Sequence, residues 1–279
     1  HTVQQKYVNL VPYITSSAIF SAAENQTSIG VVTATDAEDD NVTFTVSGSE
    51  LAITSAGVLT FASAPDYETK SSYTATVTAS DGTNSTTQAI TVNVTDVNEA
   101  PVFTSSATFS AAENQTAIDT VTATDADGDD VTFTVSGSEL VVNSAGVLTF
   151  ASAPDYETKS QYTATVTASD GTNTSTQAIT VNVTNVNDNS PSFTSSATFS
   201  AAENQTAIGT VTATDADGDT LTYSISGSDL TINSSSGVLT FASAPDYETT
   251  TAFTATVTAS DGTNSVSYTH LTLPTILPV

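Results

Sequence analysis

Apolar and polar residues alternate with a period of two through many short segments of this chain. In such a segment the apolar side chains lie on one face of an extended strand and the polar side chains on the other. Three segments place their apolar residues at Val131, Phe133 and Val135, at Tyr162, Ala164 and Val166, and at Ile179, Val181 and Val183. Clusters of Gly, Ser, Asn and Asp separate the segments, as turns require. The pattern predicts half-buried strands and gives no indication of a helix.

The same order of strands and turns occurs three times along the 279 residues. The stretch GVLTFASAPDYET begins at Gly57, Gly146 and Gly237 without a single difference, at spacings of 89 and 91 residues. A unit of about ninety residues has the size of one small domain. About seven strands in each unit predict an all-β chain of three tandem Greek-key sandwiches of immunoglobulin-like size.

The repeats also set the expected domain boundaries. We expect a remnant of a preceding linker at 1–11, repeats at 12–99, 100–189 and 190–265, and a non-native tail at 266–279. Since the chain begins at His1 and contains no Met, we expect it to be a piece of a longer product.

The end of the third repeat departs from the other two copies. Its residues 266–275, VSYTHLTLPT, resemble the translated adapter of a shotgun sequencing library. Aligned without a gap, Ile90, Val92 and Val94 of the first repeat correspond to His270, Thr272 and Pro274, so the apolar face is lost, and Leu271 and Leu273 could point inward only through a bulge. Pro274 also lacks the N–H that a sheet ladder needs. We therefore expect a third sandwich with a defective last strand.

The acidic composition of the chain restricts its possible binding partners. There are 30 acidic residues and only three basic ones, for a formal net charge of -27, while 38% of residues are hydrophobic. Such a chain folds but does not bind nucleic acid or anionic lipid through charge, and it attracts cations instead. It has no Cys, hence no disulfide, and no apolar run long enough to span a membrane.

Most carboxylates fall at strand ends and in turns. Glu24 follows the first strand, Asp36 follows the second, Asp66 and Glu68 precede the penultimate strand, and Asp81 follows it. In an antiparallel sandwich these loops gather at two poles, so the lower pole of one repeat meets the upper pole of the next. A single acidic turn is most often only a solvated turn former, but the whole set recurs three times.

The motifs AEN, DAD, DYE and SDG and the linker NVNDNSPSF resemble those of cadherin repeats, specifically the bacterial cadherin-like kind, over residues 8–265. The resemblance implies cadherin sandwiches in an extended rod, with about three Ca2+ ions at each junction between repeats. At the first junction it implies the ligands Glu24, Asp66, Glu68, the carbonyl of Val97, Asn98, Glu99, Asp125, Asp127 and Asp170. At the second it implies Glu113, Asp155, Glu157, the carbonyl of Val186, Asn187, Asp188, Asn189, Asp215, Asp217 and Asp261.

The chemistry of these groups agrees with the resemblance. Ca2+ takes six to eight oxygen ligands from carboxylates, amides and carbonyls. Each junction collects seven carboxylates, which three Ca2+ ions would nearly neutralise and which would otherwise repel one another. The first linker is one residue shorter than the second and carries Glu99 where the family has Asp, so weaker or altered binding is expected there. Before the first repeat, Asn9 is in place but Leu10 replaces an acidic ligand, so we expect at most one weak ion.

An enzyme is not expected, since the chain lacks Cys and Arg and has only His1 and His270. We expect a calcium-binding structural or adhesive segment of a bacterial extracellular or cell-surface protein, in which Ca2+ rigidifies a stalk. The parent protein would be anchored in a membrane or cell wall. Two alternatives stay open: the repeats themselves mediate homophilic or carbohydrate adhesion, with other cell-surface proteins or glycans as partners, or they space the modules of a secreted polysaccharide-active enzyme.

Overall fold

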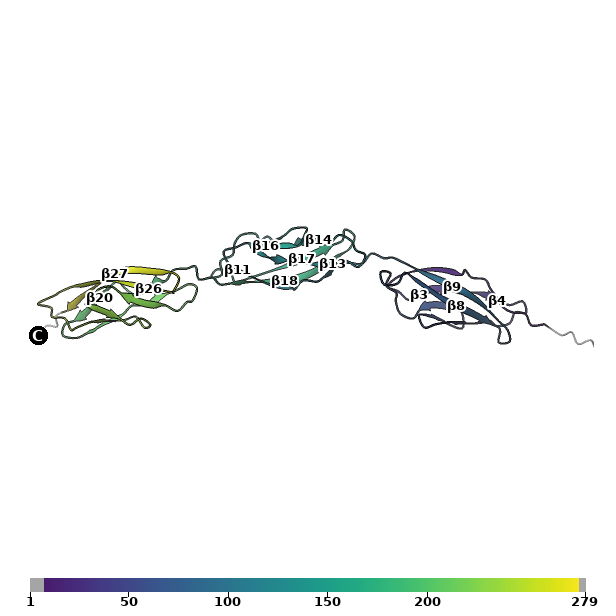
Figure 1. Cartoon of the computed structure of the whole chain (residues 1–279), viewed down its shortest axis with the longest axis horizontal. Coiled ribbons are helices and arrows are strands. Elements are labelled where there is room, and N and C mark those ends of the chain that lie inside the picture. Colours follow the sequence, from purple (N-terminus) through teal and green to yellow (C-terminus); the bar gives the residue numbers. More distant parts are fainter. Residues whose placement is uncertain (1–7, 276–279) are drawn as a thin grey trace, which may run out of the picture. The chain divides into compact units, whose positions relative to one another are not determined.

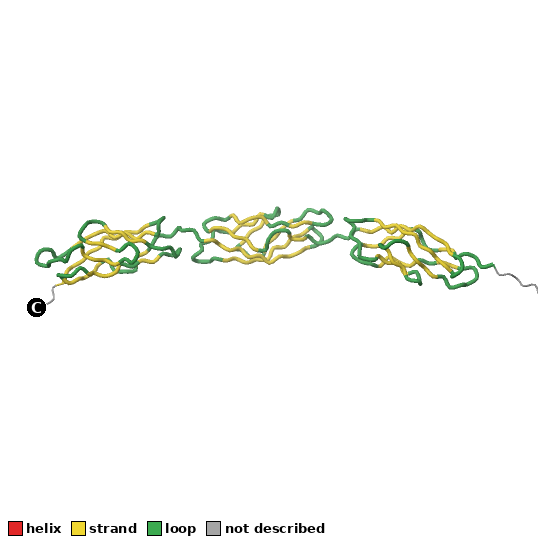
Figure 2. The backbone as a smooth tube through the Cα atoms, turned by 60° about the horizontal axis from the view of Figure 1, so that its bottom comes forward, coloured by secondary structure: helices red, strands yellow, loops and turns green. Residues whose placement is uncertain are grey.

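The computed structural model describes residues 8–275, and the side chains of residues 8–269. Every regular element in that part of the chain is a strand (Figure 2). The first repeat contains β1 (Tyr13–Ile14), β2 (Ile19–Ala23), β3 (Ser28–Val31), β4 (Ala34–Thr35), β5 (Thr43–Val46), β6 (Leu51–Ile53), β7 (Val58–Phe61), β8 (Ser72–Ser80) and β9 (Ser85–Thr95).

The other two repeats have the same succession of strands (Figure 1). The second contains β10 (Val102–Phe103), β11 (Thr108–Ala112), β12 (Ala117–Thr120), β13 (Ala123–Thr124), β14 (Thr132–Val135), β15 (Leu140–Val142), β16 (Val147–Phe150), β17 (Gln161–Ser169) and β18 (Thr174–Thr184). The third contains β19 (Ser192–Phe193), β20 (Thr198–Ala202), β21 (Ala207–Thr210), β22 (Ala213–Thr214), β23 (Thr222–Ile225), β24 (Leu230–Ile232), β25 (Val238–Phe241), β26 (Phe253–Ser260) and β27 (Ser265–Thr275).

Each repeat is a sandwich of two sheets, as the alternation predicts. In the first repeat one sheet has the order β2-β9-β8-β5 and the other the order β3-β7-β6, while β1 and β4 form a short ribbon. The first strand pairs antiparallel to β4 through β1 and then parallel to β9 through β2, so it passes from one partner to another. The nine segments are thus the seven predicted strands, with the first divided into β1 and β2 and the second into β3 and β4.

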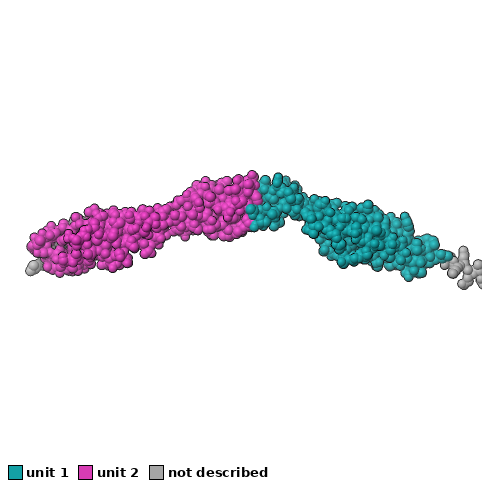
Figure 3. All heavy atoms as spheres, in the orientation of Figure 1, with its two compact units in different colours: residues 1–104, 122–132, 168–175 teal, residues 105–121, 133–167, 176–279 magenta. Residues whose placement is uncertain are grey.

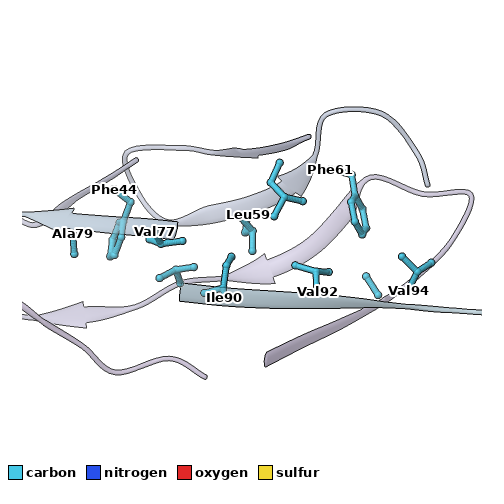
Figure 4. Packing of buried hydrophobic residues seen from close by; sticks show 11 residues of the cluster. Phe44, Leu59, Phe61, Val77, Ala79, Ile90, Val92 and Val94 are labelled. Carbon is cyan, nitrogen blue, oxygen red and sulfur yellow. The ribbon is translucent and has the colours of Figure 1, made fainter. Parts of the chain in front are cut away.

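The core lies between the two sheets and is built from the predicted apolar faces (Figure 4). Ile90 and Val92 of β9 are at most 2% exposed, and Leu59 of β7 and Val77 of β8 are fully buried. Intervening residues of these strands face outward. Burying each such side chain stabilises the fold by about 1.5–3 kcal/mol. In the second repeat Val166, Ile179, Val181 and Val183 are buried in the same way, which confirms the strand interpretation.

The glycine of GVLTF lets the chain before β7 approach closely the chain after β3, its neighbour in the same sheet. Gly57 has a φ of +85°, and a Cβ atom there would lie 2.1 Å from the carbonyl oxygen of Val32. The carbonyl of Gly57 in turn accepts a hydrogen bond from Val32 N at 2.8 Å. Only glycine combines this left-handed conformation with so close a backbone approach.

The expected defect in the last strand is not present in the backbone, and that prediction is wrong. β27 runs over eleven residues, pairs with β26 from Phe253↔Thr272 to Ser260↔Ser265, and pairs parallel with β20 as far as Ala202↔Thr275. The ladder with β26 has no bulge, so the ungapped alignment holds. Every residue except proline supplies the same backbone N–H and C=O groups to a ladder, and the register of the parallel ladder still includes Pro274, opposite Ala201. The adapter resemblance of 266–275 stays a prediction.

The chain forms two compact units (Figure 3). The first comprises residues 1–104, 122–132 and 168–175, and the second residues 105–121, 133–167 and 176–279. The first unit therefore contains every ligand predicted for the first junction, and the second unit every ligand predicted for the second. Each junction can be described within its own unit.

Candidate metal centres

One buried glutamate organises each junction. Glu24, directly after β2, is 3% exposed and accepts hydrogen bonds from Tyr67 N at 2.7 Å and from Val97 N at 2.8 Å. It thereby ties the DYE turn to the linker that follows β9. Both carboxylate oxygens are engaged with backbone donors, and such charge-assisted hydrogen bonds are roughly twice as strong as neutral ones.

Glu113 repeats this arrangement in the second unit. It is also 3% exposed, and it accepts hydrogen bonds from Tyr156 N and Val186 N, both at 2.7 Å. Val97 and Val186, whose carbonyls are predicted ligands, are thus fixed by their N–H groups to the buried glutamates.

At the first junction the carboxylates gather in two overlapping groups. Oxygens of Glu24, Glu68 and Asp96 lie within 4.8 Å of one another, and so do oxygens of Glu68, Glu99 and Asp127. Glu68 belongs to both groups. Asp96 is absent from the sequence prediction. Its counterpart in the second linker is Asn185, and the sequence prediction does not count this linker position as a ligand.

Acidic turns complete the first junction from the second repeat. Asp125 Oδ1 accepts hydrogen bonds from Asp127 N and Asp129 N at 3.1 and 3.3 Å, which closes the DADGD turn. Asp170 Oδ1 accepts from Thr172 N and Asn173 N, both at 2.6 Å. Each turn uses Oδ1 of its leading aspartate. Oδ2 of Asp125 is buried without a donor among the described residues, whereas Oδ2 of Asp170 accepts a hydrogen bond from the linker.

The linker contacts these turns directly. Asn98 Nδ2 donates to Asp170 Oδ2 at 2.8 Å, and Glu99 N donates to Asp127 Oδ2 at 2.9 Å. Asn173 Nδ2 donates to the carbonyl of Asn98 at 2.7 Å. Of the predicted ligands, Asn98 therefore contacts Asp170, and Glu99 contacts Asp127.

At the second junction the larger group contains four carboxylates. Oxygens of Glu113, Glu157, Asp188 and Asp217 lie within 4.8 Å of one another. Asp217 also belongs to a second group with Asp215 and Asp219, of which Asp219 was not predicted. Asn189 joins these groups, since its Nδ2 donates to Asp217 Oδ1 at 3.0 Å and its N to Asp217 Oδ2 at 2.9 Å.

Two other predicted ligands anchor the second linker to the third repeat. Asn264 Nδ2 donates to the side-chain oxygen of Asn187 at 2.9 Å and to the carbonyl of Asn189 at 3.1 Å. Asn264 follows the SDG turn, in which Asp261 Oδ1 accepts hydrogen bonds from Thr263 N and Asn264 N at 2.6 Å. Asn187 and Asp261 thus meet at the same turn.

Asp66 and Asp155 are held differently. Asp66 accepts hydrogen bonds from Thr69 N and Thr69 Oγ1, both at 3.0 Å, and Asp155 accepts the same two from Thr158. The bond from Thr69 N is the main reason why the pKa of Asp66 lies below its usual value. Both carboxylates close their own DYET turns.

Two other acids of the first junction have raised pKa values. A hydrogen bond shared with Asp127, together with loss of solvent and the charges of Asp127 and Glu24, raises the pKa of Asp96. Loss of solvent, with Glu24, Asp127 and Asp96 nearby, raises the pKa of Glu99. Each junction therefore holds carboxylates at a mutual electrostatic cost that a bound cation would remove.

Several buried oxygens in these groups have no hydrogen-bond donor. Among the described residues this is true of Glu99 Oε2, Asp125 Oδ2, Asp127 Oδ1, Asp215 Oδ2 and Asp261 Oδ2. An unsatisfied buried acceptor costs about 1–3 kcal/mol, and more when it is charged. Clustered carboxylate, amide and carbonyl oxygens form the donor set that Ca2+ takes, and the residues present fit that ion.

The first and third repeats each carry one half of a further junction-like group of carboxylates, at the front and the back of the chain respectively. At the front, Leu10 N donates to Glu38 Oε2 at 3.1 Å, and Asp36 Oδ2 and Asp81 Oδ2 are buried without a donor in the described part of the chain. At the back, oxygens of Glu203, Asp246 and Glu248 lie within 4.8 Å of one another.

Family comparisons agree with the repeat architecture. Residues 197–274 match the family model described as "Cadherin domain", and residues 98–184 match the one described as "Bacterial Ig domain". The cadherin match extends through most of the segment that resembles adapter sequence.

Two curated animal proteins are similar to parts of the chain. The Mus musculus "Cadherin EGF LAG seven-pass G-type receptor 1" is 38% identical over 125 residues, which is 41% of this chain and 4% of that protein. The Drosophila melanogaster "Protocadherin-like wing polarity protein stan" is 34% identical over 174 residues, 52% of this chain and 5% of that protein. The chain thus spans about a twentieth of the length of these relatives.

Solved structures establish the fold. Mouse Cadherin-23 EC22-24 superposes with a TM-score of 0.62 at 23% identity, covering 98% of this chain and 100% of that one. The Protocadherin GammaB4 extracellular domain gives 0.64 at 25% identity, covering 94% and 49%. The fold is that of tandem cadherin sandwiches, and together the matches support a cadherin-like repeat protein. Such domains are typically extracellular, calcium-binding adhesion modules and not enzymes. Residues 8–275 contain no helix that could serve as a transmembrane span.

Proposed function

We propose that this chain is a segment of an extracellular or cell-surface protein in which Ca2+ ions at the inter-repeat junctions rigidify a stalk. The observation that supports this most directly is the set of buried carboxylate oxygens without donors, which among the described residues lie at the two junctions and in the corresponding turns at the front of the first repeat. A turn former needs only one carboxylate oxygen. The second oxygen, buried and turned toward other acids, is explained by a cation.

The ligands that we propose for the first junction are those predicted from the sequence, with Asp96 added. Glu24, Glu68 and Asp96 would share one ion, and Glu68, Glu99 and Asp127 another, because these are the groups whose oxygens lie within 4.8 Å. Asp125 would contribute its free Oδ2, and Asp170 would contribute the Oδ2 that accepts from Asn98 Nδ2, for about three ions in all. Glu113, Glu157, Asp188, Asp215 and Asp217 would act likewise at the second junction.

Stiffening follows from where these groups originate. At the first junction, Glu24 and Glu68 belong to the first repeat, Asn98 and Glu99 to the linker, and the acidic turns to the second repeat. An ion held by all three restricts the linker, and removing it leaves like charges that push the parts away from one another. A bacterial origin is consistent with the match of residues 98–184 to a bacterial Ig domain model. Anchoring and partners, whether cell-surface proteins or glycans, belong to the parent protein.

The test is a Ca2+ titration of the whole chain, followed by thermal unfolding and small-angle scattering, with Mg2+ and EDTA as controls. Ligand at a hundred times its dissociation constant stabilises by about 2.7 kcal/mol per site, and modules of this kind need dissociation constants of only about 10⁻⁴ to 10⁻³ M. We expect a Ca2+-selective rise in melting temperature and a longer, stiffer particle.

A matched pair of variants tests whether the response to Ca2+ arises at the first junction. Glu68→Gln removes a carboxylate that belongs to both groups of the first junction, whereas Asp119→Asn makes the same change of charge on an exposed strand. Glu68→Gln should reduce the response to Ca2+, and Asp119→Asn should leave it unchanged. No shift in melting temperature up to about 10 mM Ca2+, above the affinity range of such modules, would contradict the proposal.

A further inference from the structure

The first repeat holds a lysine at an exposed site built for an ammonium group. Lys70 Nζ forms an ion pair with the carboxylate of Glu50 and lies 4.4 Å from the centre of the Tyr73 ring. That ring is itself fixed edge-on against Phe61, with centroids 5.1 Å apart. A carboxylate on one side and an aromatic face on the other are the two groups that bind an alkylammonium ion.

The second repeat has the same arrangement. Lys159 pairs with Glu139 and lies 4.4 Å from the centre of the Tyr162 ring. Lys70 and Lys159 are the only basic side chains between residues 8 and 269. Both lysines therefore make the same ion pair and the same ring contact at equivalent positions of the two repeats.

The third repeat keeps this site and lacks the lysine. Thr250 stands at the lysine position, Asp229 at the glutamate position and Phe253 at the tyrosine position. The surrounding geometry is unchanged, because Phe241 and Phe253 are edge-on with centroids 5.1 Å apart, as in the first repeat. Thr250 N donates to the carbonyl of Asp246 at 2.9 Å, as Lys70 N does in its own turn.

A pocket lies where the lysine side chain would run. It has a volume of about 200 Å³, and Asp229, Ala244, Pro245, Thr250 and Phe253 are among the residues that line it. In the described part of the chain no cation pairs with Asp229. The pocket thus offers a carboxylate, an aromatic face and room for an aliphatic chain.

We propose that this pocket binds the ammonium group of a lysine side chain from a different protein. The evidence is that the same structural position in the two sister repeats does bind an ammonium group, held by equivalent residues. A second copy of this chain is a poor source, since Lys70 and Lys159 are already paired and only Lys6 remains. The third repeat would then contact a basic partner at this face, independently of any ion at the junctions.

The test uses the full chain in saturating Ca2+ and follows amide NMR shifts during titration with Nα-acetyl-lysine methylamide at constant ionic strength. We expect saturable shifts at Asp229, Thr250 and Phe253. Thr250→Lys fills the pocket from within and should abolish them, while Thr251→Lys adds the same charge at the neighbouring exposed position and should retain them. Asp229→Asn should weaken binding about two- to fivefold, as expected for loss of the charge partner of the ammonium group at an exposed site.

Four outcomes would overturn the proposal. Shifts that do not saturate, or that spread over the acidic surface, would indicate only general attraction of a cation. Shifts that persist in Thr250→Lys would place the lysine elsewhere. Equal binding of the matching arginine derivative would contradict a pocket made for an ammonium group, because the planar guanidinium differs in shape and hydration. Concentration-dependent self-association lost on truncating Lys6 would identify a second copy as the occupant instead.

Discussion

Replacing Glu24 by Gln tests whether one buried carboxylate connects the linker to the first repeat. Both of its oxygens accept backbone hydrogen bonds, from Tyr67 N and from Val97 N. Glutamine has one carbonyl oxygen, which can keep one of these bonds. Its amide nitrogen then faces the other N–H group, and two donors oppose each other.

The expected loss can be worked out from these two contacts. A hydrogen bond to a charged acceptor contributes about 1.5–3 kcal/mol, so losing one lowers the local opening free energy by about 2 kcal/mol. Amide exchange through local opening should then be about 30-fold faster at Tyr67 or Val97, since each 1.4 kcal/mol is tenfold. Without Ca2+ the increase in the exchange rate should be smaller. Glu24→Gln also removes a negative charge close to Glu68 and Asp96, and the relief of this repulsion offsets part of the lost hydrogen bond.

Hydrogen exchange measured by NMR on the full chain, in Ca2+ and in EDTA, gives the answer residue by residue. Glu203→Gln is the matched control, since Glu203 accepts a weaker hydrogen bond of 3.0 Å from Tyr247 N and its linker counterparts lie beyond the described residues. Exchange at Val97 and Tyr67 that changes by less than about threefold in Glu24→Gln would refute the reasoning. So would an effect equal in Ca2+ and in EDTA.

Three further changes have defined outcomes. Asp96→Asn should lower Ca2+ affinity at the first junction at least fivefold, and Asn185→Asp should raise it at the second, both by calorimetric titration; unchanged isotherms would remove Asp96 from the ligand set. Gly57→Ala should lower the free energy of unfolding, measured by thermal denaturation, by more than about 2 kcal/mol, because its Cβ would meet a backbone oxygen. Gly48→Ala has open space around the new Cβ and should cost only about 1 kcal/mol, so equal costs would contradict the close approach at Gly57. Ile90→Ala should cost about 2–5 kcal/mol in denaturant unfolding, and a cost below 1 kcal/mol would contradict its burial.

The sandwiches follow from the sequence because period-two alternation and turn residues are local signals. Ile179, Val181 and Val183 are buried as the pattern predicts, and the two-sheet topology agrees with the fold inferred from seven strands. The last strand could not be predicted in this way. Its side chains at 270–275 break the pattern, but a strand between β20 and β26 completes two backbone ladders at once, and those hydrogen bonds do not depend on side-chain polarity.

Asp96 shows where sequence reasoning about the site reaches its limit. The sequence prediction does not count this linker position as a ligand, and the acid at 96 is an amide at 185. Asn185 instead donates its Nδ2 to the carbonyl of Asp217 at 2.9 Å, so one linker position provides an anion in one junction and a donor in the other. The difference in charge is visible in the sequence, but its proximity to Glu24 and Glu68 is not.

The acidic turns also show why a turn former and a metal ligand are not competing interpretations. In Asp125, Asp215 and Asp261, Oδ1 accepts the backbone hydrogen bonds that close the turn, while Oδ2 is buried without a donor in the described chain. Closing the turn fixes the carboxylate plane and therefore fixes where the second oxygen points. A serine could close such a turn but would offer no second anionic oxygen, and a glutamate would reach too far to close it. If these turns bind Ca2+ as proposed, a requirement for both functions in one short side chain would account for an aspartate at each of them.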